Sequence, residues 1–348
     1  MTDTGPTPYD AVVVVSFGGP EGPDDVMPFL ENVTRGRGVP RERLEEVAEQ
    51  YLATTGGVSP INAQNRALTE ALQAELAEAG HDLPVYWGNR NWQPFLADTV
   101  AEMTADGVRR AIAFVTSAYS SYSGCRQYRE DIAAARSAVG PNAPEIDKLR
   151  QFWNHPGFVE PFRDGLRDAL ADLDPPVRAR TRLVFTAHSL PVSMAATSDY
   201  QMQLEDAVAL VADDVAPDLP RDLVWQSRSG PPQVPWLEPD VNVHLRALDG
   251  SKTDHVVIVP IGFVSDHQEV IFDLDTQAAE TASELGLGMT RVATPGTDPR
   301  FVAMIRELVE ERLQPETPRR SLGSLEIRPD RCAPGCCPAP SRPAGRPQ

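Results

Sequence analysis

Short apolar runs that end abruptly in polar residues recur along this chain, and they constrain its fold more than any other feature. Two of them stand out, LVFTAHSLP (183–191) and HVVIVPIGFVSDHQEVIFDLD (255–275). Apolar runs rich in β-branched residues are typical of strands that are buried on both faces of a parallel sheet. Open α/β sheets bind ligands at the carboxyl ends of their strands, so the polar residues that follow these runs are candidates for a functional site.

Strand-like runs alternate with helical patterns throughout the sequence. Strands are expected over 11–20, 83–89, 109–120, 148–153, from 182, 223–230, from 255, and over 289–294. Helices are expected over 44–52, 62–79, 93–106, 126–139, 156–173, 200–215, from 266, and over 298–313. This alternation predicts an α/β fold with parallel sheets that are covered by helices on both faces.

Pro141 and Pro144 interrupt the alternation and divide the chain into two similar halves. We expect an N-terminal domain over 9–145, a C-terminal domain over 146–315 and a cleft between them that holds the site. Residues 316–348 form a tail rich in proline and cysteine. Such a composition cannot build a core of its own, which predicts a tail that is either disordered or held by a metal centre.

The net charge of −18 excludes some partners at the level of the whole protein. A strongly acidic surface repels nucleic acid and anionic membranes. The first apolar run, residues 11–15, is far too short for a membrane helix or a signal sequence. We therefore expect a cytoplasmic protein that is a monomer, binds no nucleic acid and has no integral membrane association.

His188 and Glu269 are the candidate catalytic residues, because each lies just after an apolar run. A neutral imidazole can accept a proton, and imidazole and carboxylate together suit ferrous iron. Asp273 and Gln277 follow Glu269 at spacings of four residues, which places all three on one helix face. The alternative is an ordinary polar histidine beside a solvated acidic face. His267 points elsewhere on a helix and is expected to act as a cap or to support the site residues from behind.

Two glycine-rich turns lie at 16–25 and 54–62, and neither contains a nucleotide-binding fingerprint. The first is expected to lie over a flat ligand. In the second, Ser59, together with Arg35 and Arg37, could grip carboxylates, although exposed arginines are more often simply solvated.

The four cysteines are Cys125 in the body of the chain and Cys332, Cys336 and Cys337 in the tail. Four thiolates are enough for an iron–sulfur cluster or a structural zinc ion. The C-x3-C-C spacing differs from the paired C-x2-C units of zinc ribbons, which disfavours zinc. Either centre would hold the tail against the body.

Four motifs together, TAHSLP, GFVSDHQEVIFDLD, SFGGP and GGVSPIN, resemble those of the ferrochelatases, above all the coproporphyrin III ferrochelatases of actinobacteria. The resemblance extends from about Tyr9 to Cys337. It implies a lyase of haem biosynthesis that inserts Fe2+ into a porphyrin and releases two protons. It also implies two similar Rossmann-like domains of the type II chelatase kind, with the active site between them.

The resemblance assigns roles to individual residues. His188 would be the pyrrole-proton acceptor, an iron ligand or both, Glu269 the opposing carboxylate, and Asp273 the next metal-binding position. Ser59, Tyr128, Arg126 and Phe17 would contact the porphyrin. Cys125, Cys332, Cys336 and Cys337 match the ligands of the 2Fe–2S cluster that some members bind.

Three positions depart from the pattern of the family. Gln277 replaces a further carboxylate, Phe17 replaces a tyrosine that approaches the metal, and Asn91 replaces an outer histidine. These departures weaken the case for an outer metal site.

Other functions remain open at this point. The substrate would be coproporphyrin III or, as the alternative, protoporphyrin IX, and a coproheme decarboxylase would act downstream. A cobalt chelatase would be expected to lack these paired motifs and the cysteine tail. A tetrapyrrole or iron–sulfur sensor without catalytic activity is the alternative from another class.

Overall fold

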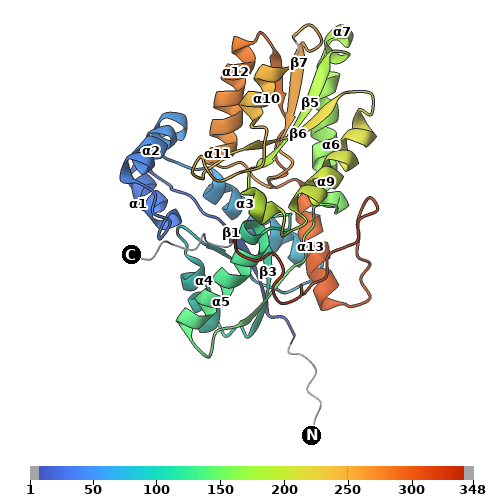
Figure 1. The fold of residues 1–348 in the computed structure, drawn as a ribbon. Coiled ribbons are helices and arrows are strands. Elements are labelled where there is room, and N and C mark those ends of the chain that lie inside the picture. Colours follow the sequence, from blue (N-terminus) through green and yellow to red (C-terminus); the bar gives the residue numbers. More distant parts are fainter. Residues whose placement is uncertain (1–7, 249, 341–348) are drawn as a thin grey trace.

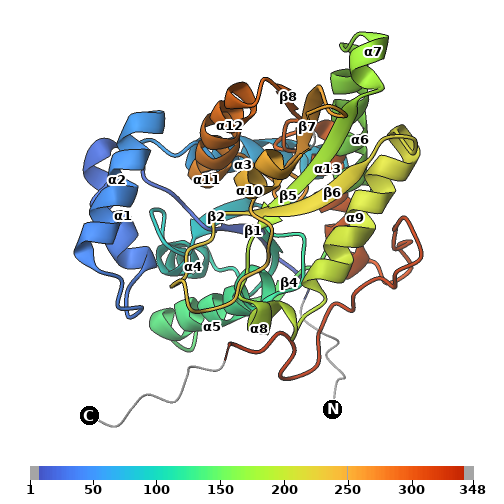
Figure 2. The same cartoon turned by 45° about the horizontal axis from the view of Figure 1, so that its top comes forward.

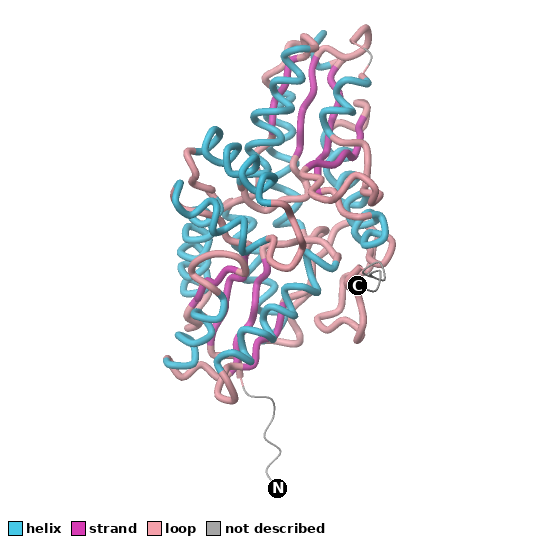
Figure 3. The backbone as a smooth tube through the Cα atoms, turned by 60° about the vertical axis from the view of Figure 1, so that its left-hand side comes forward, coloured by secondary structure: helices cyan, strands magenta, loops and turns pink. Residues whose placement is uncertain are grey.

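The computed structural model describes residues 8–248 and 250–340, and they form two parallel four-stranded sheets. The strand orders are β2-β1-β3-β4 and β6-β5-β7-β8, so the second half of the chain repeats the topology of the first. Figures 1 and 3 show the two sheets at opposite ends of the molecule, each flanked by helices. The predicted α/β class with two similar parallel sheets is confirmed.

The first sheet is built around β1, which is buried along its whole length. Its strands are β1 (Ala11–Ser16), β2 (Val85–Asn89), β3 (Arg110–Val115) and β4 (Glu145–Lys148). The run of valines in β1 is completely buried because β2 and β3 pair on its two sides and helices cover both faces. The boundary predicted at residue 145 lies within β4.

The second sheet has β5 in the equivalent inner position. Its strands are β5 (Thr181–His188), β6 (Arg221–Gln226), β7 (His255–Val259) and β8 (Gly288–Arg291). β5 pairs in parallel with β6 on one side and with β7 on the other. The carboxyl ends of β5 and β7 are therefore neighbours, and these are the ends of the two apolar runs singled out in the sequence.

Helices connect the strands and cover the sheets. Those of the first half are α1 (Pro23–Val33), α2 (Arg41–Thr55), α3 (Ile61–Glu78), α4 (Leu96–Ala105) and α5 (Gln127–Val139). Those of the second half are α6 (Pro156–Ala171), α7 (Pro175–Arg178), α8 (Val192–Ala195), α9 (Tyr200–Val215), α10 (Val241–Ala247), α11 (Gln268–Val270), α12 (Ala279–Glu284) and α13 (Pro299–Leu313). Two π-helical segments complete the set, η1 (Tyr122–Arg126) and η2 (Ile271–Ala278).

One predicted strand is wrong. Residues 148–153 were expected to begin the second sheet, but only Lys148 is in a strand, and it belongs to the first sheet. The segment crosses the interior between the two halves, so Leu149, Phe152 and Trp153 are almost fully buried without pairing in a sheet. Burial without sheet pairing gives the same residue pattern as a buried strand.

One hydrophobic core joins the two halves. It contains residues of both sheets, such as Val12, Leu183 and Val257, together with the inner face of α13. Phe114 of the first sheet and Phe158 of α6 both pack against Phe301 of α13. The halves are thus held together by buried apolar surface as well as by the connecting chain.

The tail follows α13 and returns to the first half of the molecule. Figure 2 shows it passing α9 and α8 before it reaches α5. Arg328 pairs with Asp199 just before α9, and Arg126 beside α5 donates a hydrogen bond to the carbonyl of Cys336. Part of the predicted tail, residues 341–348, lies outside the described residues. Within the described ranges, no helix is long and apolar enough to cross a membrane.

Candidate active site

His188 and Glu269 come together because their loops leave adjacent parallel strands. β5 ends at His188, and the loop that follows β7 leads to Glu269 in α11. The Gly262 amide donates to the Thr186 carbonyl over 3.0 Å, which ties this loop to β5. The Nε2 atom of His188 then lies 3.6 Å from Oε2 of Glu269.

A backbone carbonyl determines the tautomer of His188. Its Nδ1 lies 2.6 Å from the Ser189 carbonyl oxygen. A carbonyl only accepts, so Nδ1 carries the proton and the neutral ring presents a lone pair at Nε2. That lone pair is on the side of Glu269, and both side chains are partly exposed. The arrangement suits a proton acceptor or a metal ligand.

Two buried tyrosines, which the sequence did not single out, hold the backbone on both sides of the site. Tyr200 donates to the carbonyl of His188 over 2.9 Å, and Tyr119 donates to the carbonyl of Ile261 over 2.8 Å. Burial raises the pKa of both hydroxyls, so each keeps its proton and remains a donor. Tyr119 follows β3 and therefore positions the loop of the second sheet from the first half of the chain.

His267 caps α11, as predicted. Its Nδ1 accepts a hydrogen bond from the Glu269 amide over 3.2 Å. Burial lowers the pKa of the His267 imidazole. The cap fixes the start of the short helix that carries Glu269 and leaves the carboxylate of Glu269 directed towards His188.

Asp273 lies deeper than Glu269 and is held by the end of β6. Ser227 donates to its carboxylate, and Gln226 does so over 3.3 Å. Burial, opposed by the Ser227 hydrogen bond and reinforced by the charge of Glu269, raises the pKa of Asp273 to about 6. Asp273 therefore retains a proton more readily than an ordinary aspartate does.

The helix that carries Asp273 is π-helical, which the sequence reasoning did not predict. η2 spans Ile271–Ala278 between α11 and α12. π-helical turns are rare and occur frequently at functional sites. Gln277, which the spacing predicts on the same helix face as Glu269 and Asp273, is exposed.

Aromatic side chains of the first half border the site. Phe17 packs on Phe29, and Phe29 packs on Tyr51. Burial and, after it, the negative charge of Glu269 raise the pKa of Tyr51. Thr55 of α2 also donates to the side chain of Gln268 over 2.9 Å. The first half therefore supplies an apolar wall to the residues of the second half.

A cavity of about 490 Å3 has walls from both halves of the chain. It is lined by Gln64 and Ala67 of α3 and, from the second half, by Asp266 and residues 294–298. His188 and Glu269 do not line it. Asp266 already accepts hydrogen bonds from Arg291 and Thr294, and its amide donates to Gln64.

Of the four residues predicted to contact substrate, Phe17 is the exposed one. Ser59 and Tyr128 are buried. Arg126 pairs with Glu130 and with the Cys336 carbonyl, so its side chain is engaged by the tail. These four assignments stay predictions.

Arg90 was missed by the sequence reasoning. Its guanidinium lies 4.6 Å from the ring centre of Tyr128 and 5.8 Å from that of Phe17, and it pairs with Asp131 over 2.7 Å. It follows β2 by one residue, so its position at the end of a strand was the available signal.

The cysteines of the tail return to Cys125. All four are free thiols, and Cys125 and Cys337 are buried. Burial and the neighbouring cysteines raise the pKa of Cys332, and they raise that of Cys337 to about 12. Cys125 and Cys332 both line a cavity of about 290 Å3. In residues 8–248 and 250–340, however, no three histidine, cysteine or acidic side chains are close enough to hold one metal ion.

Comparisons with known proteins agree with this architecture. The ferrochelatase family model matches residues 9–313. The coproporphyrin III ferrochelatase of Nocardia farcinica is 56% identical to this chain, over 96% of the chain and 98% of that protein. That of Frankia alni is 57% identical, over 95% of the chain and 87% of that protein.

A solved structure shares the fold at low identity. SirB from Bacillus subtilis with Fe3+ has a TM-score of 0.53 and 12% identity, and the match covers 87% of this chain and 97% of that one. The likeness concerns the arrangement of the two α/β halves. The family match over most of the chain and the identity to full-length relatives lead to one conclusion: the chain belongs to the ferrochelatase family.

Proposed function

We propose that this protein is a coproporphyrin III ferrochelatase, which inserts Fe2+ into coproporphyrin III to form coproheme during haem biosynthesis. The observation that carries the proposal is the opposition of His188 Nε2 and Glu269 Oε2 at 3.6 Å in a ferrochelatase fold. The names of relatives with more than half of their residues identical support the substrate.

The reaction replaces two pyrrole protons by one ferrous ion, so the site must accept two protons and deliver iron. His188 accepts a proton at Nε2, because Nδ1 is already committed to the Ser189 carbonyl. Glu269, partly exposed beside it, binds iron or passes the proton outward. Asp273 extends the carboxylate pair inward, where its pKa of about 6 lets it exchange protons near neutral pH.

The apolar wall suits the porphyrin macrocycle. Phe17, within the SFGGP motif, and Val192, directly after TAHSLP, are exposed although both are apolar. Arg90 lies behind Phe17, but its charge is paired with Asp131. Coproporphyrin III carries four carboxylates and protoporphyrin IX carries two, and the names of the relatives are what favour the former.

We further propose that Cys125, Cys332, Cys336 and Cys337 bind a 2Fe–2S cluster that holds the tail. The support is that all four cysteines are free thiols and that Cys125 and Cys332 line one cavity, whereas in residues 8–248 and 250–340 no three such side chains are placed to hold one metal ion. Bound, the cluster would supply a redox-active group away from His188. We also propose that the protein is a cytoplasmic monomer and that its product, coproheme, passes to a decarboxylase.

Anaerobic metalation assays with Fe2+ test the function directly, with coproporphyrin III and protoporphyrin IX compared side by side by visible absorbance. We expect rapid metalation of coproporphyrin III, and His188→Ala should abolish most of it while porphyrin binding is retained. Preference for protoporphyrin IX would overturn the substrate. Binding of both porphyrins without metalation would overturn the enzyme and favour a tetrapyrrole sensor.

A further inference from the structure

Helices α1 and α2 form a small unit with a core of its own, called the α1–α2 unit here (residues 23–55). That core is separate from the one that joins the two halves, and its buried apolar residues are Val26, Phe29, Leu30, Leu44 and Ala48. The unit carries Phe29 and Tyr51 of the apolar wall. Contacts at the edge of the unit therefore influence where this wall lies relative to the second half.

Gln268 joins the end of α2 to the short helix that carries Glu269. Its buried side chain accepts a hydrogen bond from the Thr55 hydroxyl over 2.9 Å and donates one to the Gln50 carbonyl over 3.5 Å. Gly56, in the left-handed conformation, ends α2 directly after Thr55 and so fixes where the helix presents this hydroxyl. The residue next to the catalytic carboxylate is thus bound to the first half of the chain.

Other contacts on the backbone of Glu269 come from the second half. His267 accepts a hydrogen bond from its amide over 3.2 Å, and Gln226 donates to its carbonyl over 3.3 Å. These two contacts fix Glu269 relative to the ends of β6 and β7, but they do not relate it to the wall of the α1–α2 unit. Gln268 supplies that connection.

We propose that Gln268 is a positioning residue for iron insertion, which through Thr55 and α2 sets the distance between the Glu269 carboxylate and the apolar wall. The inference rests on the proposed function. Metal transfer needs the carboxylate and the macrocycle in one geometry, and a displacement of about 1 Å can lower a rate by about 10²-fold. Because the side chain of Gln268 is buried, its loss should lower kcat rather than raise KM for the porphyrin.

Thr69 of α3 provides a matched control for Thr55. Both hydroxyls donate to the carbonyl four residues earlier in their own helix, over 3.2 Å from Thr55 and 2.7 Å from Thr69. Thr55→Val and Thr69→Val therefore remove the same kind of contact within a helix, but Thr55→Val also removes the hydrogen bond to Gln268. Thr55→Ser keeps the hydroxyl and should behave like wild type.

The experiment measures kcat and KM for anaerobic metalation by the full chain, with Fe2+ and the porphyrin that the wild-type protein metalates faster. Gln268→Met and Thr55→Val should each lower kcat by up to about 10²-fold and leave KM for the porphyrin unchanged. The double variant should be no slower than the slower single variant, because both changes remove one contact. Thr69→Val and Thr55→Ser should keep the wild-type kcat.

The outcomes separate the two proposals. A wild-type protein that metalates neither porphyrin would overturn the proposed function and this inference with it. Wild-type kcat in both Gln268→Met and Thr55→Val would overturn the inference alone, and so would a raised KM with unchanged kcat. An equal loss of kcat in Thr69→Val and Thr55→Val would also overturn it. Should Gln268→Met fail to fold, Thr55→Val, Thr55→Ser and the Thr69→Val control decide the result.

Discussion

Glu269 differs from the other acidic residues of its segment because its carboxylate faces two histidines. Its carboxylate lies 3.6 Å from Nε2 of His188 and 4.0 Å from Nδ1 of His267. Burial is the main cause of the raised pKa of Tyr51 and of Asp273, and the negative charge of Glu269 adds to both. Because this carboxylate lies near both histidines and adds to both shifts, its charge is the most informative one to remove.

Glu269→Gln should lower the rate of metalation by about 10²- to 10⁴-fold, the usual contribution of a positioned acid–base group. The amide has nearly the same shape, so porphyrin binding should be retained, as measured by fluorescence quenching. Glu280→Gln is the control, because Glu280 lies in α12 just beyond the same segment and is exposed. A Glu269→Gln enzyme with wild-type turnover would contradict the role of this carboxylate.

Residues at the ends of apolar runs could be predicted from the sequence, and those that act through the backbone could not. His188 and Glu269 were found because each follows a buried strand, and the structure brings them together. Tyr119 and Tyr200 act on backbone carbonyls from positions that look like ordinary core aromatics. Their contribution depends on where distant segments meet, which no local pattern encodes.

At the scale of elements, the close contact between the loop after β7 and the end of β5 sets the position of His188. Gly262 lies in the loop after β7, and a Cβ atom there would meet the Cβ of Ala187 at 2.6 Å and its Cα at 2.7 Å. Ala187 is fully buried and immediately precedes His188. The loop can follow β5 this closely only because residue 262 has no side chain.

Gly262→Ala should therefore displace the end of β5 and lower the turnover number for metalation. We also expect a loss of about 1–3 kcal/mol in the free energy of unfolding, typical of overpacking in a core. Gly250→Ala is the control, since nothing lies within 4 Å of a Cβ there. Unchanged turnover in a folded Gly262→Ala protein would mean that the position of His188 does not depend on this contact.

The sequence predicted helices in the regions of the two π-helical segments but not their π-helical form. Residues 126–139 and the segment from 266 were predicted to be helical, and both regions are helical, but η1 precedes α5 and η2 forms the centre of the second. η1 contains Cys125 and η2 contains Asp273. Apolar spacing distinguishes helix from strand, but the difference between α and π turns is too small for it to resolve.

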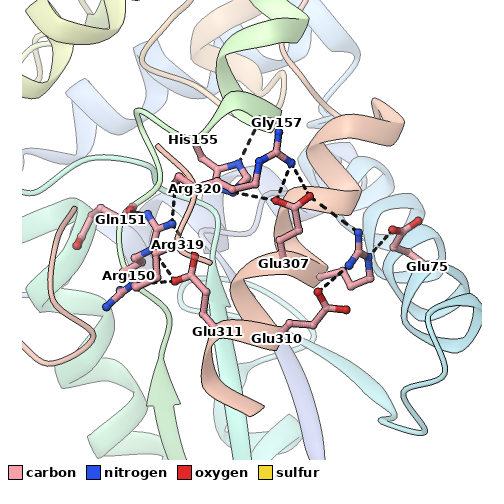
Figure 4. Close-up of polar contacts among 11 residues, drawn as sticks. Glu75, Arg150, Gln151, His155, Gly157, Glu307, Glu310, Glu311, Arg319 and Arg320 are labelled. Carbon is pink, nitrogen blue, oxygen red and sulfur yellow. Dashed lines mark hydrogen bonds and ion pairs between the residues drawn. The ribbon is translucent and has the colours of Figure 1, made fainter. Parts of the chain in front are cut away.

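At the scale of the whole molecule, α13 connects both halves and the tail through charged residues as well as through the core. Figure 4 shows Glu311 of α13 facing Arg150 and Arg319. Arg150 binds it with two hydrogen bonds, over 2.8 Å and 2.7 Å, and Arg319 of the tail adds a third over 3.1 Å. Neighbouring Glu307 binds Arg320 of the tail and the buried His155.

The Arg150–Glu311 pair is almost fully buried, with side-chain exposures of 1% and 3%. Glu311→Gln would leave the guanidinium of Arg150 without its counter-charge, so we expect a loss of about 3–5 kcal/mol in the free energy of unfolding measured in urea. Replacing both partners by apolar residues, Arg150→Met with Glu311→Leu, should restore most of it. Glu316→Gln, at an exposed position just beyond α13, is the control. If Glu311→Gln had the same free energy of unfolding as this control, the buried Arg150–Glu311 pair would not stabilise the contact between α13 and the segment that links the two halves.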